Sequence, residues 1–154
     1  MQGKISFFSM LKVPLYIAFA VIVVRLILEF SGAPNAVSMI FGVAWLHILV
    51  PIYFALKISE NEFEKPLIAL IKITLLFSVI VRFAVGITYV LAHLFNWSIP
   101  RFAMVTNADV TPLMGYLVLP LSAFVFYVLI TLLVGIITGG LTLLVKGKIS
   151  KTKG

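Results

Sequence analysis

Long stretches of apolar residues, separated by shorter polar connections, dominate the chain. A helix needs about 20 mainly apolar residues to cross the hydrocarbon core of a bilayer. Four segments come close to this length or exceed it. We therefore expect an all-α membrane protein, a four-helix transmembrane bundle with short loops. It forms a single four-span transmembrane domain over residues 1–154, with spans at about 13–30, 36–56, 66–95 and 112–145.

Turn formers and helix caps set the boundaries of these segments. The turn formers Ser31-Gly32-Ala33-Pro34 end the first segment, and Asn35 is a candidate N-cap for the second. Pro66 suits the first turn of the third. The fourth is longer than a perpendicular span requires, so we expect tilt, a kink at Pro120 or a cytoplasmic extension. Two charged residues near the end of the first segment argue against its removal as a signal peptide, so we expect it to remain as a helix.

Lysine and arginine residues are distributed unevenly between the two sides of the predicted bundle. Lys4 and Lys12 precede the first segment, Lys57 and Lys65 flank the second connection, and the C-terminal tail carries four lysines. The first connection has no basic residue and the third has only Arg101. Since cytoplasmic flanks carry the excess of basic residues, we expect both termini and the second connection to be cytoplasmic. The expected location is a bacterial cytoplasmic (inner) membrane, which the protein crosses several times.

Composition agrees with a lipid environment and excludes several functions. The chain is 62% hydrophobic and 11% charged, whereas soluble domains are about 45–50% apolar and about 25% charged. The net charge of +7 comes from residues that flank apolar segments. Because they form no basic stripe with interleaved aromatics, we expect no nucleic-acid binding. The absence of cysteine excludes disulfides, thiolate metal sites and cysteine nucleophiles.

Ionisable residues inside the predicted spans are the main candidates for function. A guanidinium at the bilayer centre costs about 3 kcal/mol on insertion scales and is rarely left without a partner. With a rise of about 1.5 Å per residue, the four candidates fall at mid-depth or in the outer half of the bundle. We expect them to converge as a polar cluster or ligand-binding site: Arg25, Glu29, His47 and Arg82. Further contributors are expected from the outer side: Tyr89, His93 and Asp109.

Helical spacing indicates which faces of the segments point inward. Polar and small residues recur at intervals of three or four on one face of each of three segments. Small residues let helices approach closely in lipid, and Gly135 with Gly139 forms a small-xxx-small pair. The three faces are Ala44, His47, Pro51 and Ala55 in the second segment, Ser78, Arg82, Gly86, Tyr89 and His93 in the third, and Thr131, Gly135, Thr138 and Thr142 in the fourth.

The partner of Arg82 stays open at the level of the sequence. Glu29 can form a structural ion pair with Arg82 or with Arg25. Because two arginines face one glutamate, one cation lacks an evident partner within the spans. The candidates for that partner are Asp109 folding in from the outer loop, a lipid phosphate, a ligand carboxylate, a quinone-like carbonyl and a partner subunit.

The sequence favours no cofactor and no catalytic centre. His47 and His93 differ in height by more than about 10 Å at 1.5 Å per residue, so we do not expect them to ligate one haem iron. No metal site, paired carboxylates within a span or Gly-rich phosphate loop is evident. A quinone or a lipid remains the candidate ligand.

Three functional hypotheses follow. The leading one is a small non-catalytic integral membrane protein, an accessory subunit that acts through helix packing. Its expected partners are membrane lipids and either other membrane subunits or further copies of the chain. The second is a protein that binds or transports a quinone or lipid in a polar outer-half pocket around Arg82. The third is a membrane enzyme that uses Glu29 or His47 as a proton carrier.

Overall fold

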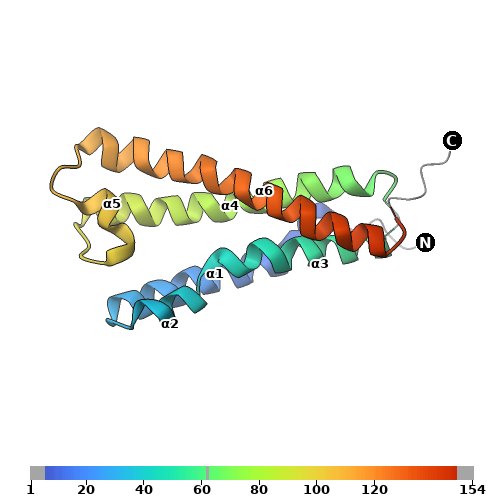
Figure 1. Cartoon of the computed structure of the whole chain (residues 1–154), viewed down its shortest axis with the longest axis horizontal. Helices are drawn as coiled ribbons and strands as arrows, with labels where there is room; N and C mark the ends of the chain where they lie inside the picture. Colours follow the sequence, from blue (N-terminus) through green and yellow to red (C-terminus); the bar gives the residue numbers. More distant parts are fainter. Residues whose placement is uncertain (1–5, 62, 149–154) are drawn as a thin grey trace.

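Helices make up all the regular structure in the part of the chain that the computed structural model describes, residues 6–61 and 63–148 (Figure 1). Four helical segments are long and apolar enough to cross a membrane: Phe7–Phe30, Asn35–Glu60, Pro66–Leu94 and Met114–Val145. The prediction of four long apolar helical segments is confirmed.

Two of these segments are single helices and two are composite. The single helices are α1 (Phe7–Phe30) and α4 (Pro66–Leu94). Short helices join α4 to the last segment. In chain order the remaining elements are α2 (Asn35–Ile40), the 3₁₀ turn η1 (Val43–Trp45), α3 (Leu46–Glu60), the 3₁₀ turn η2 (Pro100–Phe102), α5 (Ala103–Thr106), the π-helical turn η3 (Met114–Val118) and α6 (Leu119–Val145).

Local signals account for most of the helix ends. The side chain of Ser6 caps α1 by accepting a hydrogen bond from the Ser9 backbone N–H at 3.3 Å, so α1 begins well before the predicted start near residue 13. After α1 the chain turns at Gly32, whose φ of 76° lies in the left-handed region that glycine tolerates. Pro66 occupies the first turn of α4, as predicted. Asn35 is the first residue of α2 and makes no capping hydrogen bond, so the prediction of Asn35 as an N-cap is wrong.

The second segment is interrupted, which the sequence did not predict. Helix α2 ends at Ile40, and the helical conformation resumes only in η1 and α3. A Cβ atom on Gly42, at the interruption, would lie 3.1 Å from Nη1 of Arg25 and 2.9 Å from the Met39 carbonyl oxygen. The predicted span over 36–56 is thus present but contains an interruption, at the point where the Arg25 side chain packs against Gly42.

The last segment contains an irregular turn near the predicted kink. Its π-helical turn, η3, lies directly before Pro120 in the first turn of α6. Proline has no N–H to donate, and a helix commonly accommodates it by a local change in hydrogen bonding. Gly115 in this turn packs directly against the ring of His93 on α4.

The segments pack tightly toward the end at which α1 begins and α6 ends, here called the terminal end. A Cβ on Gly135 of α6 would lie 2.7 Å from Thr74 Cγ2, and one on Gly139 would lie 2.9 Å from the Pro51 carbonyl oxygen. The small-xxx-small pair therefore brings α6 against both α3 and α4. Fully buried side chains, among them Phe54 and Phe77, fill the space between these helices and α1.

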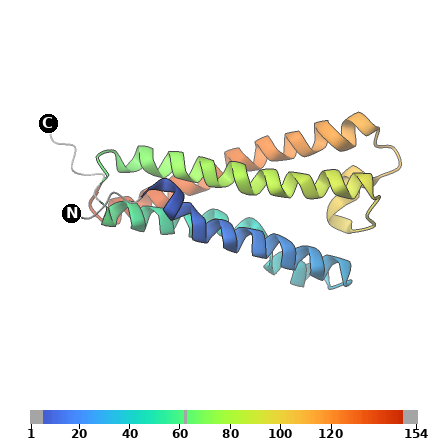
Figure 2. The same cartoon turned by 180° about the vertical axis from the view of Figure 1, so that it is seen from behind.

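The bundle opens toward its opposite end, here called the α5 end. There α1 and α2 diverge from α4 and α6, as both views show (Figures 1 and 2). The connection after α4 folds back onto the bundle, with Phe102 and Val105 fully buried. The connection packs against Leu26 of α1 and Leu119 of α6 and so covers this end of the bundle.

Candidate functional site

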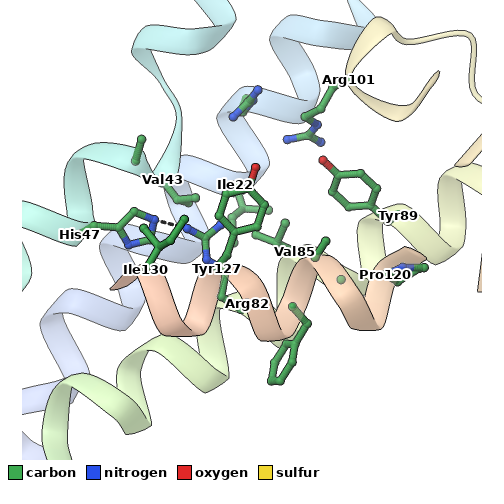
Figure 3. Close-up of a pocket in the computed structure, with 15 residues that line it drawn as sticks. Ile22, Val43, His47, Arg82, Val85, Tyr89, Arg101, Pro120, Tyr127 and Ile130 are labelled. Atoms are coloured by element: carbon green, nitrogen blue, oxygen red, sulfur yellow. Dashed lines mark hydrogen bonds between the residues drawn. The ribbon is translucent and has the colours of Figure 1, made fainter. Parts of the chain in front are cut away.

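Arg82 lies in the middle of α4 and is held by groups from two other segments. Only 6% of the residue is exposed. Its Nη2 contacts Nε2 of His47, in the first turn of α3 (Figure 3). The guanidinium also stacks on Tyr127 of α6, with Cζ 4.5 Å from the ring centroid. Among the described residues, no carboxylate lies within ion-pair distance of it.

The contacts of His47 define its tautomer. Thr131 Oγ1 lies 3.0 Å from Nδ1 of His47 and donates its own hydrogen to the Tyr127 carbonyl at 2.7 Å. A guanidinium has donors only, so His47 Nε2 accepts from Arg82 and Nδ1–H donates to Thr131. His47 is therefore a neutral imidazole that holds Arg82 in place without neutralising its charge.

A second cluster of charged residues lies closer to the α5 end. Glu29 and Arg25 of α1 form an ion pair at 2.8 Å, and Arg101 of η2 approaches the other Glu29 oxygen at 3.1 Å. The Glu29 side chain is only 6% exposed. Burial lowers the pKa of the Arg101 guanidinium, and Glu29 opposes that shift. The ion pair between Arg101 and Glu29 ties the connection after α4 to α1.

Tyr89 lies between these two groups. Its ring packs edge-on against Phe102 at a centroid distance of 5.0 Å, and Arg101 stacks on the same Phe102 ring at 4.3 Å. The Tyr89 hydroxyl points toward Arg101 (Figure 3). The buried connection thus positions a cation and a phenol together on the side of the site nearest α5.

These side chains surround a cavity of about 400 Å³ (Figure 3). Its volume falls within the roughly 300–1,000 Å³ of small-molecule sites. All four long segments and the connection after α4 contribute to its wall. None of the described residues in that wall is acidic. The polar ones are Arg25, His47, Arg82, Tyr89, Arg101 and Tyr127.

One side of the cavity has little helix packing. Helix α6 packs on α4 and α3, but no extensive contact joins it to α2 or η1. Tyr127, which faces this side from α6, is 43% exposed, and Ala44 of η1 is exposed as well. Ala44 and Tyr127 are the exposed residues of the wall, so the cavity is least covered between η1 and α6.

The structure brings some of the sequence-predicted residues together and places others elsewhere. Arg25, His47, Arg82 and Tyr89 line the cavity, and Glu29 pairs with two arginines beside it. His93 donates from Nδ1 to the Val105 carbonyl at 2.5 Å and lies outside the wall. Asp109 is exposed and also lies outside the wall.

Three residues of the site did not emerge from the sequence as candidates. Tyr127 lies four residues before Thr131, so extending the polar face of the fourth segment by one step would have included it. Thr131 was placed on that face, but its bond to His47 has no local signal. Arg101 stood out only as the single basic residue of an apolar connection, and its position depends on the tertiary fold.

Among the described residues, no group of three or more histidine, aspartate or glutamate side chains is placed to hold a metal ion. No protein-family model, curated protein or solved structure matches the chain. Over residues 6–61 and 63–148 the fold is that of a small helical protein with four helices long and apolar enough to cross a membrane.

Proposed function

We propose that the chain is a multi-pass protein of a bacterial cytoplasmic membrane, with both termini in the cytoplasm. Large apolar side chains are exposed along all four long segments, which suits contact with lipid. Lys12, Lys57 and Lys146 lie toward the terminal end, and Arg101 belongs to the α5 end. This distribution supports a cytoplasmic terminal end and an outer α5 end.

In this orientation the cavity lies in the outer half of the bilayer. We propose that it binds a lipophilic molecule with an anionic or carbonyl-bearing head group, as a step in binding or transport. The observation that carries this proposal is the buried guanidinium of Arg82, which lines a cavity of about 400 Å³ and has no carboxylate partner in the described structure. A buried cation is strongly unfavourable unless an anion or several acceptors approach it.

The least covered side of the cavity, between η1 and α6, supports access from the membrane. The connection after α4 covers the cavity toward the α5 end, where Arg101 is tied to Glu29 and Phe102 is fully buried. A ligand with an apolar tail can enter sideways, with its head among the arginines and its tail in lipid. A water-soluble ligand would need to displace the packed connection.

Native mass spectrometry of protein extracted gently from its own membrane tests this function. We expect a reproducible small-molecule adduct that is lost in Arg82→Leu. The matched control is Lys72→Leu, which removes an exposed cation from the same helix and should keep the adduct. An adduct-free wild-type monomer would contradict the proposed function.

An accessory subunit that acts through helix packing is our second proposal. The exposed apolar faces of α1 and α6 that suit lipid also suit a partner helix or a second copy of the chain. A stoichiometric complex with other membrane subunits and no adduct, in the same mass spectrum, is the result that this alternative predicts.

A further inference from the structure

Positive charge exceeds negative charge around the cavity. Glu29 lies between Arg25 and Arg101, at 2.8 and 3.1 Å. Arg82 is held by the neutral imidazole of His47. Within the described residues, Glu29 is the one carboxylate that contacts any of these three guanidiniums, so the site keeps an excess of two positive charges.

Several hydrogen-bond donors at the site also lack acceptors. Within the described protein, Arg82 Nε, Arg101 Nε and Arg101 Nη2 have no hydrogen-bond partner. Arg101 Nη2 is 3.1 Å from Glu29 Oε2, but this ion pair lacks the geometry of a hydrogen bond. Because Arg82 is only 6% exposed, the acceptor for its Nε–H has to come from a group within the cavity.

We propose that the head group bound in the cavity is a phosphate monoester or a diphosphate on a lipid. The inference rests on the proposed ligand-binding function and names the chemical class of the ligand. A terminal phosphate carries a charge of about −1.5 to −2 and three strong acceptor oxygens. Its charge therefore balances the two excess positive charges of the site, and its oxygens can accept from the unpaired N–H groups of Arg82 and Arg101. Guanidinium groups bind phosphate with paired hydrogen bonds, which suits a site built from arginine rather than lysine.

Other head groups fit the site less well. A quinone carbonyl accepts hydrogen bonds but is neutral, so it leaves the whole excess charge in place. A carboxylate or a phosphodiester carries a single negative charge and leaves part of that excess. In lipid, charge left over in this way is costly.

The remainder of the cavity suits the apolar part of such a lipid. The wall also carries apolar side chains, with Ile22 from α1, Val43 from η1 and Val85 from α4. The tail is then free to leave the bundle between η1 and α6. Free inorganic phosphate has the same head-group chemistry, but it has no apolar part. It therefore gains no binding free energy from this region of the wall.

Competition between defined ligands tests the inference. The purified protein is placed in phosphatidylcholine nanodiscs and titrated with phosphatidic acid, phosphatidylglycerol, diacylglycerol, ubiquinone or inorganic phosphate. Native mass spectrometry measures the occupancy. We expect phosphatidic acid to bind at least about tenfold more tightly than phosphatidylglycerol or diacylglycerol, since hydrogen bonds to charged groups differ by this much or more. Inorganic phosphate that bound as tightly as phosphatidic acid would overturn the lipid part of the inference.

Two arginine variants and one control complete the experiment. Arg101→Leu changes a residue outside the long helices and should weaken phosphatidic acid binding at least about tenfold even if Arg82→Leu fails to fold. Lys72→Leu should leave binding unchanged. Preferential binding of ubiquinone would overturn the phosphate inference and leave the proposed ligand-binding function standing. If the wild type bound none of these ligands and carried no adduct from its own membrane, both would fail.

Discussion

Arg82 is held by a ring nitrogen and an aromatic face, and this choice of partners keeps its charge available. His47 accepts from Arg82 through Nε2 while its Nδ1–H donates to Thr131. Tyr127 contributes the negative face of its ring at 4.5 Å. A carboxylate in the place of His47 would stabilise Arg82 more strongly but would cancel the charge. The residues around Arg82 therefore orient a cation without neutralising it.

Replacement of His47 tests this arrangement. His47→Leu leaves a buried guanidinium N–H without an acceptor, which costs about 1–3 kcal/mol or more for a charged donor. We expect a lower midpoint of thermal unfolding in detergent, measured by circular dichroism. His47→Gln should recover part of the loss, because its amide oxygen can accept from Arg82. Equal loss in both variants would contradict the acceptor role.

For individual residues, the sequence predicted the depth of a side chain in the bundle better than the contacts of that side chain. A rise of about 1.5 Å per residue placed His47 and Arg82 at similar levels, and the structure brings them into contact. The position of Arg101 was not predictable in this way, because it depends on how a connection without strong periodicity folds back onto the bundle. The pairing of Glu29 with Arg25 was one of two open alternatives, and no local rule excluded the other.

At the scale of elements, close packing at the terminal end and divergence at the α5 end together produce the cavity. Gly135 and Gly139 let α6 approach Pro51 of α3 and Thr74 of α4. Beyond this contact α6 follows α4, while α1 and α2 diverge from them (Figure 1). The space between the two pairs holds the arginines.

Two neighbouring glycines in α6 allow a matched test of the close approach. In Gly139→Ala the new methyl would lie 2.9 Å from the Pro51 carbonyl oxygen, a backbone atom, so the helices must separate. Overpacking of this kind costs about 1–3 kcal/mol. Gly140→Ala meets nothing within 4 Å and should not destabilise the protein. Thermal unfolding measured in parallel should separate the two variants, and indistinguishable midpoints would count against the packing.

The ion pairs of Glu29 are expected to hold the connection after α4 in place. Glu29→Gln removes the charge that attracts both Arg25 and Arg101, so backbone amides around residues 99–106 should exchange hydrogen faster. Hydrogen–deuterium exchange with mass spectrometry measures this directly. Glu60→Gln is the control, because the Lys57–Glu60 pair at 2.8 Å is exposed and such pairs contribute little. Unchanged exchange around 99–106 would show that the apolar packing of Phe102 is sufficient.

The interrupted second segment shows where sequence patterns stop being informative about elements. Its apolar residues continue through Gly42 without a change in composition, so hydropathy alone predicted one helix. The interruption coincides with the contact between Gly42 and the Arg25 side chain from another segment. Contacts of this kind, between residues of different segments, are not visible in the local sequence pattern. Pro66 and Gly32, by contrast, act on their own backbone, and both marked helix boundaries correctly.

At the scale of the whole molecule, the distribution of charge gives the proposed orientation. The lack of cysteine makes this orientation simple to test with single-cysteine variants. Ser98 is exposed at the α5 end and Glu60 is exposed at the terminal end, so each is a suitable position for a single cysteine. We expect a membrane-impermeant maleimide to label Ser98→Cys in intact cells and Glu60→Cys only after permeabilisation. The reverse pattern would place the cavity in the inner half of the membrane.

The measurement that tests the central claim most directly is a crystal structure grown in a lipidic mesophase from protein that keeps its own lipids. We predict density for a head group in contact with Arg82 and Arg101, continuous with a tail that leaves between η1 and α6. A structure in which α6 closes against η1 and Arg82 finds a carboxylate of the chain itself would contradict this prediction.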